Sequence, residues 1–354
     1  MDRALSDTIR FLRFPLMVGV VFIHTHMGNI SIGGEMVTSM QQFPWFAAVY
    51  HLFTDVIARM AVPCFFLISG YLFFYGIQKW DCQVYLAKLK SRVHSLLIPY
   101  VFWNAFWVIA LYVGQLLFPR LLSGNNLLVS DYGWRQWLDV CLANNAMNPF
   151  WFVRDLMLLV VAAPLFYGML KYAKYPSLIG LVAATCLFYK LEWTVLGVEP
   201  IAFFFAGACL SQCNLRVAQV CQIRHLFLVL YTLLIGLDFY LWYQASPYLF
   251  HVHMLSLWIG IPTLFTWLMH GFKKGVLKNS TTLSDASFFL FCIHNPIAVF
   301  ACKLWVMCLS PMTDAKMIVG YVLIPALISV GAVYVYLLLR KTMPRFTAVI
   351  TGGR

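Results

Sequence analysis

Two ionisable side chains in one apolar segment have a spacing that suits a shared chemical task. Arg13 and His24 lie eleven residues apart in a segment predicted to be helical. Eleven residues at 100° each make three turns plus about 20°, so both side chains face the same way across a rise of about 16 Å. A cation at one end and an imidazole at the other end of one stripe suit a long substrate that lies between them. Alternatively, Arg13 is an anchor at the membrane surface and His24 is a packing residue.

Other ionisable residues also interrupt apolar segments. Asp55 and Arg59 are spaced i, i+4, so we expect them to pair on one helix face. Arg154 and Asp155 follow Trp151, and because adjacent residues do not face each other on a helix, each needs its own partner. Ionisable groups inside a membrane are costly and are functional candidates by default. The alternative is that these charges pair between helices and only hold the bundle together.

A further histidine, His294, is predicted near mid-membrane beside Pro296, which we expect to disrupt its helix. Proline frees a backbone carbonyl that must find another partner in a membrane. His294 therefore either lines a cavity or satisfies such a carbonyl.

Basic and small residues mark two more segments. Lys88, Lys90 and Arg92 precede an apolar run and suit phosphate binding, or else act as anchors at the membrane surface. Ser69 and Gly70 form a notch of small residues within another apolar run. Such a notch permits the close approach of a second helix or of a ligand.

The elements that must position these residues follow from composition. The 354 residues are 62% apolar and only 11% charged, which excludes a soluble enzyme, a disordered chain and a disulfide-stapled module. A polytopic membrane protein remains, and at about 20 residues for each span the length allows about ten transmembrane helices. We predict an all-α protein with a single domain over residues 1–354. The ten predicted spans are 9–27, 46–76, 95–118, 149–170, 177–194, 199–213, 225–243, 251–271, 286–308 and 317–339.

Charge distribution predicts the orientation. With the N-terminus inside, 18 of the 25 Lys and Arg residues fall in inner segments, so both termini are expected to be cytoplasmic. The net charge of +12 is spread in short clusters, which does not indicate nucleic-acid binding. The ten cysteines lie mostly in apolar runs without metal-ligand spacing, so we expect neither a metal site nor a disulfide framework. The first apolar run lacks a cleavage site and is expected to be retained.

Five segments together resemble the membrane acyltransferase-3 family, in the family's order and with its ten-span topology. Two positions depart from the family pattern: Phe291 replaces a tyrosine, and Ser95, beside His94, replaces the second arginine of a basic motif. The matching segments are Arg13 to His24 (Arg-x10-His), Val62 to Leu72, Arg92 to Tyr100, Phe150 to Leu156 and Ser287 to His294.

This resemblance implies transfer of an acetyl group from cytoplasmic acetyl-CoA to a hydroxyl of an exported glycan, in a bacterial inner membrane. It leaves open succinyl as the acyl group, and polysaccharide, lipid-linked sugar, peptidoglycan or an amino compound as the acceptor. His24 is then the general base or the nucleophile. The other implied roles are CoA binding by Arg13, Lys88, Lys90, Arg92 and Ser69, catalytic support from Asp55 and Arg59, and acceptor binding by Trp151, Arg154, Asp155 and His294.

Two other functions compete with this interpretation. A transporter on the same fold would also carry intramembrane charges, but it would bind solute without transferring an acyl group. A non-catalytic membrane scaffold would lose only stability when Arg13 or His24 is replaced.

Overall fold

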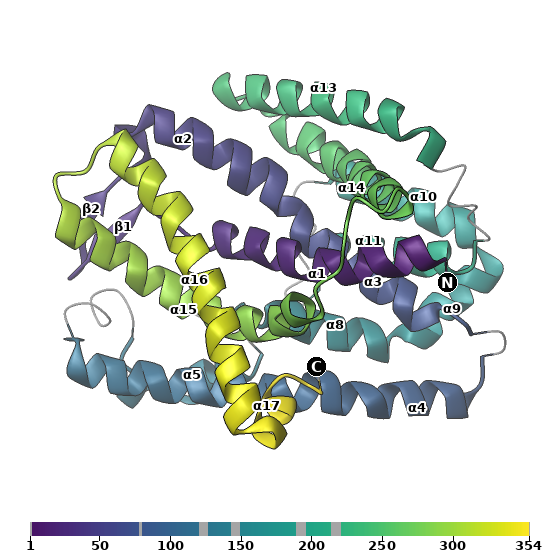
Figure 1. The fold of residues 1–354 in the computed structure, drawn as a ribbon, viewed down its shortest axis with the longest axis horizontal. Helices are drawn as coiled ribbons and strands as arrows, with labels where there is room; N and C mark the ends of the chain where they lie inside the picture. Colours follow the sequence, from purple (N-terminus) through teal and green to yellow (C-terminus); the bar gives the residue numbers. More distant parts are fainter. Residues whose placement is uncertain are drawn as a thin grey trace. The chain divides into compact units, whose positions relative to one another are not determined.

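The computed structural model describes residues 2–77, 80–119, 127–142, 149–188, 196–213 and 221–353. The sequence also predicts a long outer loop at about 119–149, and its turn motifs at 124–126 and 144–145 lie outside the described residues. Each of the ten predicted spans overlaps helical structure among the described residues, although the end of the span predicted at 177–194 lies outside them (Figure 1).

Helices dominate the described chain. The first half contains α1 (Arg3–Ile23), α2 (Pro44–Tyr50), α3 (Ala61–Phe74), α4 (Cys82–Arg92), α5 (Ile98–Leu117) and α7 (Trp134–Cys141). The second half contains α8 (Trp151–Val161), α9 (Ala163–Tyr172), α10 (Lys174–Leu187), α11 (Val198–Ser211), α13 (Arg224–Tyr243), α14 (Leu249–Lys273), α15 (Thr281–Leu309), α16 (Asp314–Thr342) and α17 (Pro344–Ile350). Short 3-10 turns occur at Met40–Gln42, Ala58–Met60 and Val129–Asp131, and π-helical turns at His51–Ile57 and Val93–Leu97.

By length and composition, six helical segments of the described chain can cross a membrane. Helices α8 and α9 add a seventh if this pair, bent by 57°, counts as one span. Helix α1 is long enough, but its first half carries charged residues, and α10 and α11 are shorter apolar helices. Ten spans and cytoplasmic termini remain predictions. The six segments are Pro44–Phe74, Cys82–Leu117, Arg224–Tyr243, Leu249–Lys273, Thr281–Leu309 and Asp314–Thr342.

The described chain is consistent with the predicted all-α fold class, and it also contains a short β-hairpin after α1 that the sequence did not predict. Strands β1 (Ile30–Ile32) and β2 (Glu35–Thr38) pair antiparallel. Gly33 and Gly34 connect them with φ angles of +63° and +91°. Two consecutive residues with positive φ form the turn that matches the twist of a hairpin, and glycine adopts it without a steric penalty.

The chain divides into two compact units. The first unit comprises Met1–Leu16, Val56–Ser91 and Asp155–Ser284, and the second comprises Met17–Asp55, Arg92–Arg154 and Asp285–Arg354. Within the first unit, α3 packs along α11, and α13 lies along α14 (Figure 1). The second unit contains the hairpin, α5 and α16, and most of α15.

Two glycines let α3 and α11 pack closely in the first unit. A Cβ atom on Gly70 would collide with the carbonyl of Phe204, and one on Gly207 would collide with the carbonyl of Leu67. The small-residue notch at Ser69 and Gly70 therefore accommodates a second helix, one of its two expected uses. Ser69 is half-buried next to this contact.

In the second unit, Pro296 does not disrupt α15, contrary to the prediction, because the helix continues from Thr281 to Leu309. Proline lacks the N–H that would bond the carbonyl four residues earlier, which here belongs to Cys292. The Trp107 indole N–H of α5 donates to that carbonyl at 2.7 Å. A side chain from a second helix thus satisfies the backbone group, as membrane helices require.

Replacing Trp107 with phenylalanine should lower the free energy of unfolding by about 1–3 kcal/mol, because the Cys292 carbonyl loses its partner. Unfolding in detergent with a denaturant series measures this. Adding Pro296→Ala supplies an amide N–H in the helix, so the double variant should regain part of the loss. Equal stability of Trp107→Phe and the wild type would contradict this account.

Candidate functional site

Two imidazoles meet in the second unit at the end of α1. The helix ends at Ile23, and the His24 amide still donates to the Val20 carbonyl at 3.2 Å. The half-buried His24 ring lies 5.1 Å from the His294 ring, centroid to centroid, with 59° between their planes. His24 was predicted as a site residue from its spacing to Arg13, and His294 from its place in an apolar run beside Pro296; the structure brings the two together.

The ring of His294 is held in a defined way. The residue is 0% exposed, and its Nδ1–H donates to the Phe291 carbonyl at 2.8 Å. Its Nε2 is buried and has no hydrogen-bond partner among the residues that the structure describes. With Nδ1 as the donor, a neutral imidazole presents an unprotonated Nε2. A buried acceptor of this kind is costly unless a ligand or water completes it.

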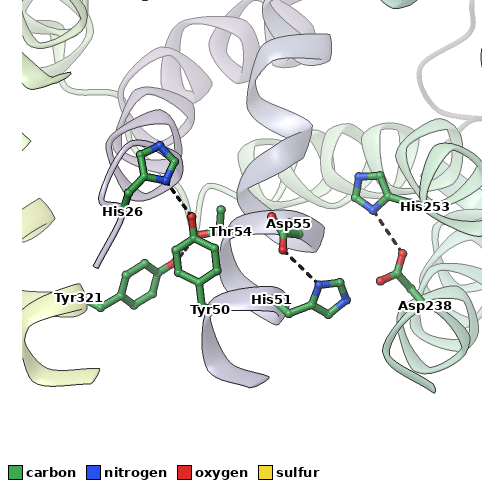
Figure 2. A network of polar contacts seen from close by, with 8 residues as sticks. All are labelled: His26, Tyr50, His51, Thr54, Asp55, Asp238, His253 and Tyr321. Atoms are coloured by element: carbon green, nitrogen blue, oxygen red, sulfur yellow. Dashed lines mark hydrogen bonds and ion pairs between the residues drawn. The ribbon is translucent and has the colours of Figure 1, made fainter. Parts of the chain in front are cut away.

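Tyr50, Thr54 and Tyr321 place a group of hydroxyls beside a third histidine, His26 (Figure 2). Nδ1 of the exposed His26 lies 3.1 Å from the Tyr50 hydroxyl, and the His24 and His26 rings are 6.1 Å apart. The Thr54 hydroxyl bonds that of Tyr321 at 2.6 Å, and it also hydrogen-bonds Tyr50. Sequence analysis did not assign these hydroxyl residues. Only the position of His26, two residues after His24, would have indicated this part of the site.

The predicted pair of Asp55 with Arg59 is wrong. His51 Nδ1–H donates to Asp55 at 3.2 Å in the second unit, and Arg59 lies 3.9 Å from Glu199 in the first. Residues His51–Ile57 form a π-helical turn, followed by a 3-10 turn at Ala58–Met60. These turns change the angular spacing between residues, so the i, i+4 rule of a regular α-helix does not hold across them.

The basic side chains predicted to bind CoA have different surroundings. Arg13 is half-buried on α1, which continues through Pro15. On α4, Lys88 and Arg92 are half-buried whereas Lys90 is exposed, as expected for residues two apart on a helix. Lys88 donates to the Phe73 carbonyl at 2.7 Å, so part of its hydrogen-bonding capacity serves the fold.

Helix α8 carries the predicted acceptor-binding residues. Trp151 is half-buried at its start, and Arg154 donates to the Leu142 carbonyl at 2.7 Å. Asp155 is buried. Arg154 thus caps the C-terminal end of α7, which is a structural task alongside the predicted one.

A separate polar pair in the first unit was not predicted from the sequence. His253 on α14 donates through Nδ1 to Asp238 on α13 at 3.2 Å, and Asp238 is 0% exposed (Figure 2). Asp238 is the acidic residue within the apolar run of α13, and that isolation would have been the signal. Polar pairs of this kind hold membrane helices together.

Replacing Asp238 with alanine should destabilise the protein by about 1 kcal/mol, the size of an interhelical hydrogen bond in a membrane. A thermal melt in detergent measures the loss. Thr232→Ala on the same helix is the matched control, since Thr232 is exposed and bonds only its own helix, at the Leu228 carbonyl. Equal melting temperatures for the two variants would contradict a stabilising hydrogen bond between α13 and α14.

Comparisons with known proteins identify the chain. A family model described as an acyltransferase domain, of the acyltransferase-3 type, matches residues 7–341. The chain is 26% identical over 373 aligned residues to the succinoglycan biosynthesis protein ExoH of Rhizobium meliloti, covering 100% of this chain and 94% of the relative. No solved structure matches the chain. Because the match extends across nearly all of its spans, from the first helix to the last apolar one, the chain belongs to the acyltransferase-3 family.

Proposed function

We propose that this protein is an integral membrane O-acyltransferase that moves an acetyl group from cytoplasmic acetyl-CoA to a hydroxyl group of an exported glycan. The observation that carries the proposal is the contact of His24 with the buried His294 at the end of α1. A neutral imidazole nitrogen can accept a proton from a hydroxyl or attack a thioester, so His24 suits either role.

The basic side chains supply the expected donor site. CoA is highly anionic, and guanidinium and ammonium groups bind phosphates through charge-assisted hydrogen bonds. We assign this task to Arg13, Lys90 and Arg92. Lys88 also contributes, through the ammonium N–H groups that do not donate to the Phe73 carbonyl. The exposed Lys90 is the most accessible of the four to a phosphate.

A polysaccharide is the acceptor that the relative favours, since ExoH is named for succinoglycan biosynthesis. Trp151 offers a half-buried aromatic ring, which suits a sugar face. The bacterial inner membrane, where cytoplasmic donor and exported acceptor meet, is the corresponding location.

Reconstitution tests this proposal directly. The full chain is placed in proteoliposomes with radiolabelled acetyl-CoA or, in a parallel arm, radiolabelled succinyl-CoA. The acceptor probe is extracellular polysaccharide from cells that express this protein, and its esters are first removed with mild alkali. An O-acyltransferase is supported if label becomes bound to the polysaccharide and alkali then releases it. The acyl-CoA that gives this label, acetyl-CoA or succinyl-CoA, identifies the acyl group.

Two other results would overturn the proposal. Label that crosses the membrane as a free small molecule, with none on the polysaccharide, would indicate a transporter. The absence of CoA binding, of transfer and of transport in both arms would indicate a scaffold.

A further inference from the structure

We propose that His26, held by Tyr50, is the general base for the acceptor hydroxyl, which leaves His24 to act on the acyl group. This inference rests on the proposed function and divides between two histidines a task that one was expected to perform. It depends on contacts within the second unit alone.

The two histidines differ in access. His26 is exposed, whereas His24 is half-buried against the fully buried His294. Their ring centroids are 6.1 Å apart. A general base reaches a hydroxyl oxygen over about 2.6–3.2 Å, so two rings at this separation can act on one reacting group. A bulky sugar hydroxyl approaches the exposed ring more readily than the half-buried one.

Tyr50 fixes the orientation of His26. Its hydroxyl engages Nδ1 at 3.1 Å, which leaves Nε2 as the nitrogen available to a substrate (Figure 2). The Tyr50 ring packs against Phe46 and Tyr321, with centroids 5.8 and 5.5 Å away. Thr54 fastens the Tyr321 hydroxyl at 2.6 Å. A base whose second nitrogen is held by a rigid partner is pre-oriented for proton transfer.

Desolvation and a neighbouring carboxylate act in opposite directions on His26. Desolvation of the ring is the larger effect and disfavours its protonated form, whereas the Asp55 carboxylate, which also accepts from His51, stabilises the positive charge that His26 acquires when it takes a proton. Tyr50 and His24 are further titratable side chains near this ring.

In the transfer step one bond forms, one bond breaks and one proton moves. The acceptor oxygen forms a bond to the acyl carbon while His26 Nε2 takes the hydroxyl proton. The bond from the acyl carbon to its leaving atom breaks, and that atom is the CoA sulfur in direct transfer or a His24 nitrogen if His24 first carries the acyl group. The proton on His26 then passes to the CoA thiolate or to solvent, which restores the neutral base.

The test uses the full chain in proteoliposomes with alkali-treated polysaccharide. The donor is the radiolabelled acyl-CoA, acetyl or succinyl, from which the wild type labels the polysaccharide. His26→Ala should lower kcat by about 100-fold or more, the usual contribution of a general base. Free imidazole added to the assay should restore part of the rate, because the vacated position is exposed. His225→Ala is the control, since His225 is an exposed histidine of the first unit outside this cluster.

A second variant separates orientation from packing. Tyr50→Phe keeps the ring but removes the hydroxyl, so kcat should fall about five- to tenfold with KM for the polysaccharide unchanged. Tyr243→Phe, at an exposed tyrosine of the first unit, is the matched control.

The outcomes distinguish this inference from the function on which it rests. Wild-type transfer with an unaffected His26→Ala variant, or a loss that imidazole does not restore, would overturn the role of His26 alone. An unchanged kcat in Tyr50→Phe would overturn the positioning role of Tyr50. No transfer by the wild type would overturn the proposed function instead.

Discussion

Replacing His24 with alanine should abolish acyl transfer, with a loss of about 100-fold to 10,000-fold in kcat. The reason is that the proposed function needs this imidazole, as general base or as nucleophile, and the neighbouring His294 is buried and bonded to the Phe291 carbonyl. The measurement is alkali-labile label on the polysaccharide in proteoliposomes.

A matched control is needed because His24 also packs against His294. His270→Ala replaces another half-buried histidine, in α14 of the first unit, and should leave transfer unchanged. Donor binding by His24→Ala, measured by calorimetry with CoA, should stay near the wild-type value. Normal transfer by a folded His24→Ala protein would eliminate the catalytic role of this residue.

Replacing Gly207 with valine should prevent stable folding, with a cost of about 3 kcal/mol or more. The added Cβ would collide with the carbonyl of Leu67, which belongs to the backbone of α3 and cannot move as a flexible side chain does. Gly70→Val should have the same effect, because its Cβ would collide with the Phe204 carbonyl of α11. Since proteins are stable by only about 5–15 kcal/mol, a loss of this size is severe.

Size-exclusion chromatography and thermal melting in detergent would measure the effect. Gly236→Val is the matched control, since Gly236 also lies inside a helix but has no atom within 4 Å of the position of its Cβ. A Gly207→Val protein that elutes and melts like the control would show that α3 and α11 can separate at little cost.

Much of the fold was predictable from sequence because the bilayer imposes a local rule. Each span needs a run of about 20 apolar residues, so counting such runs located helices such as α13 and α14. His24 could also be predicted as a candidate site residue, because an ionisable side chain in an apolar run is costly to bury in a membrane. The β1–β2 hairpin was missed, although Gly33 and Gly34 were its signal.

Local rules failed where the backbone departs from regular geometry. The spacing of Asp55 and Arg59 predicted a pair, but that prediction assumed 3.6 residues per turn throughout. The π-helical and 3-10 turns between His51 and Met60 invalidate that assumption. Asp55 instead bonds His51, and Arg59 approaches Glu199.

The sequence alone therefore determined which segments are apolar helices and which polar residues they carry, because both depend on neighbours along the chain. Only the tertiary structure decided which of those residues meet. Thr54 and Tyr321 are 267 residues apart and share a hydrogen bond. The ring of His24, just after α1, contacts the ring of His294 on α15. Such contacts depend on how helix surfaces pack against each other in three dimensions, and no spacing within a single helix encodes them.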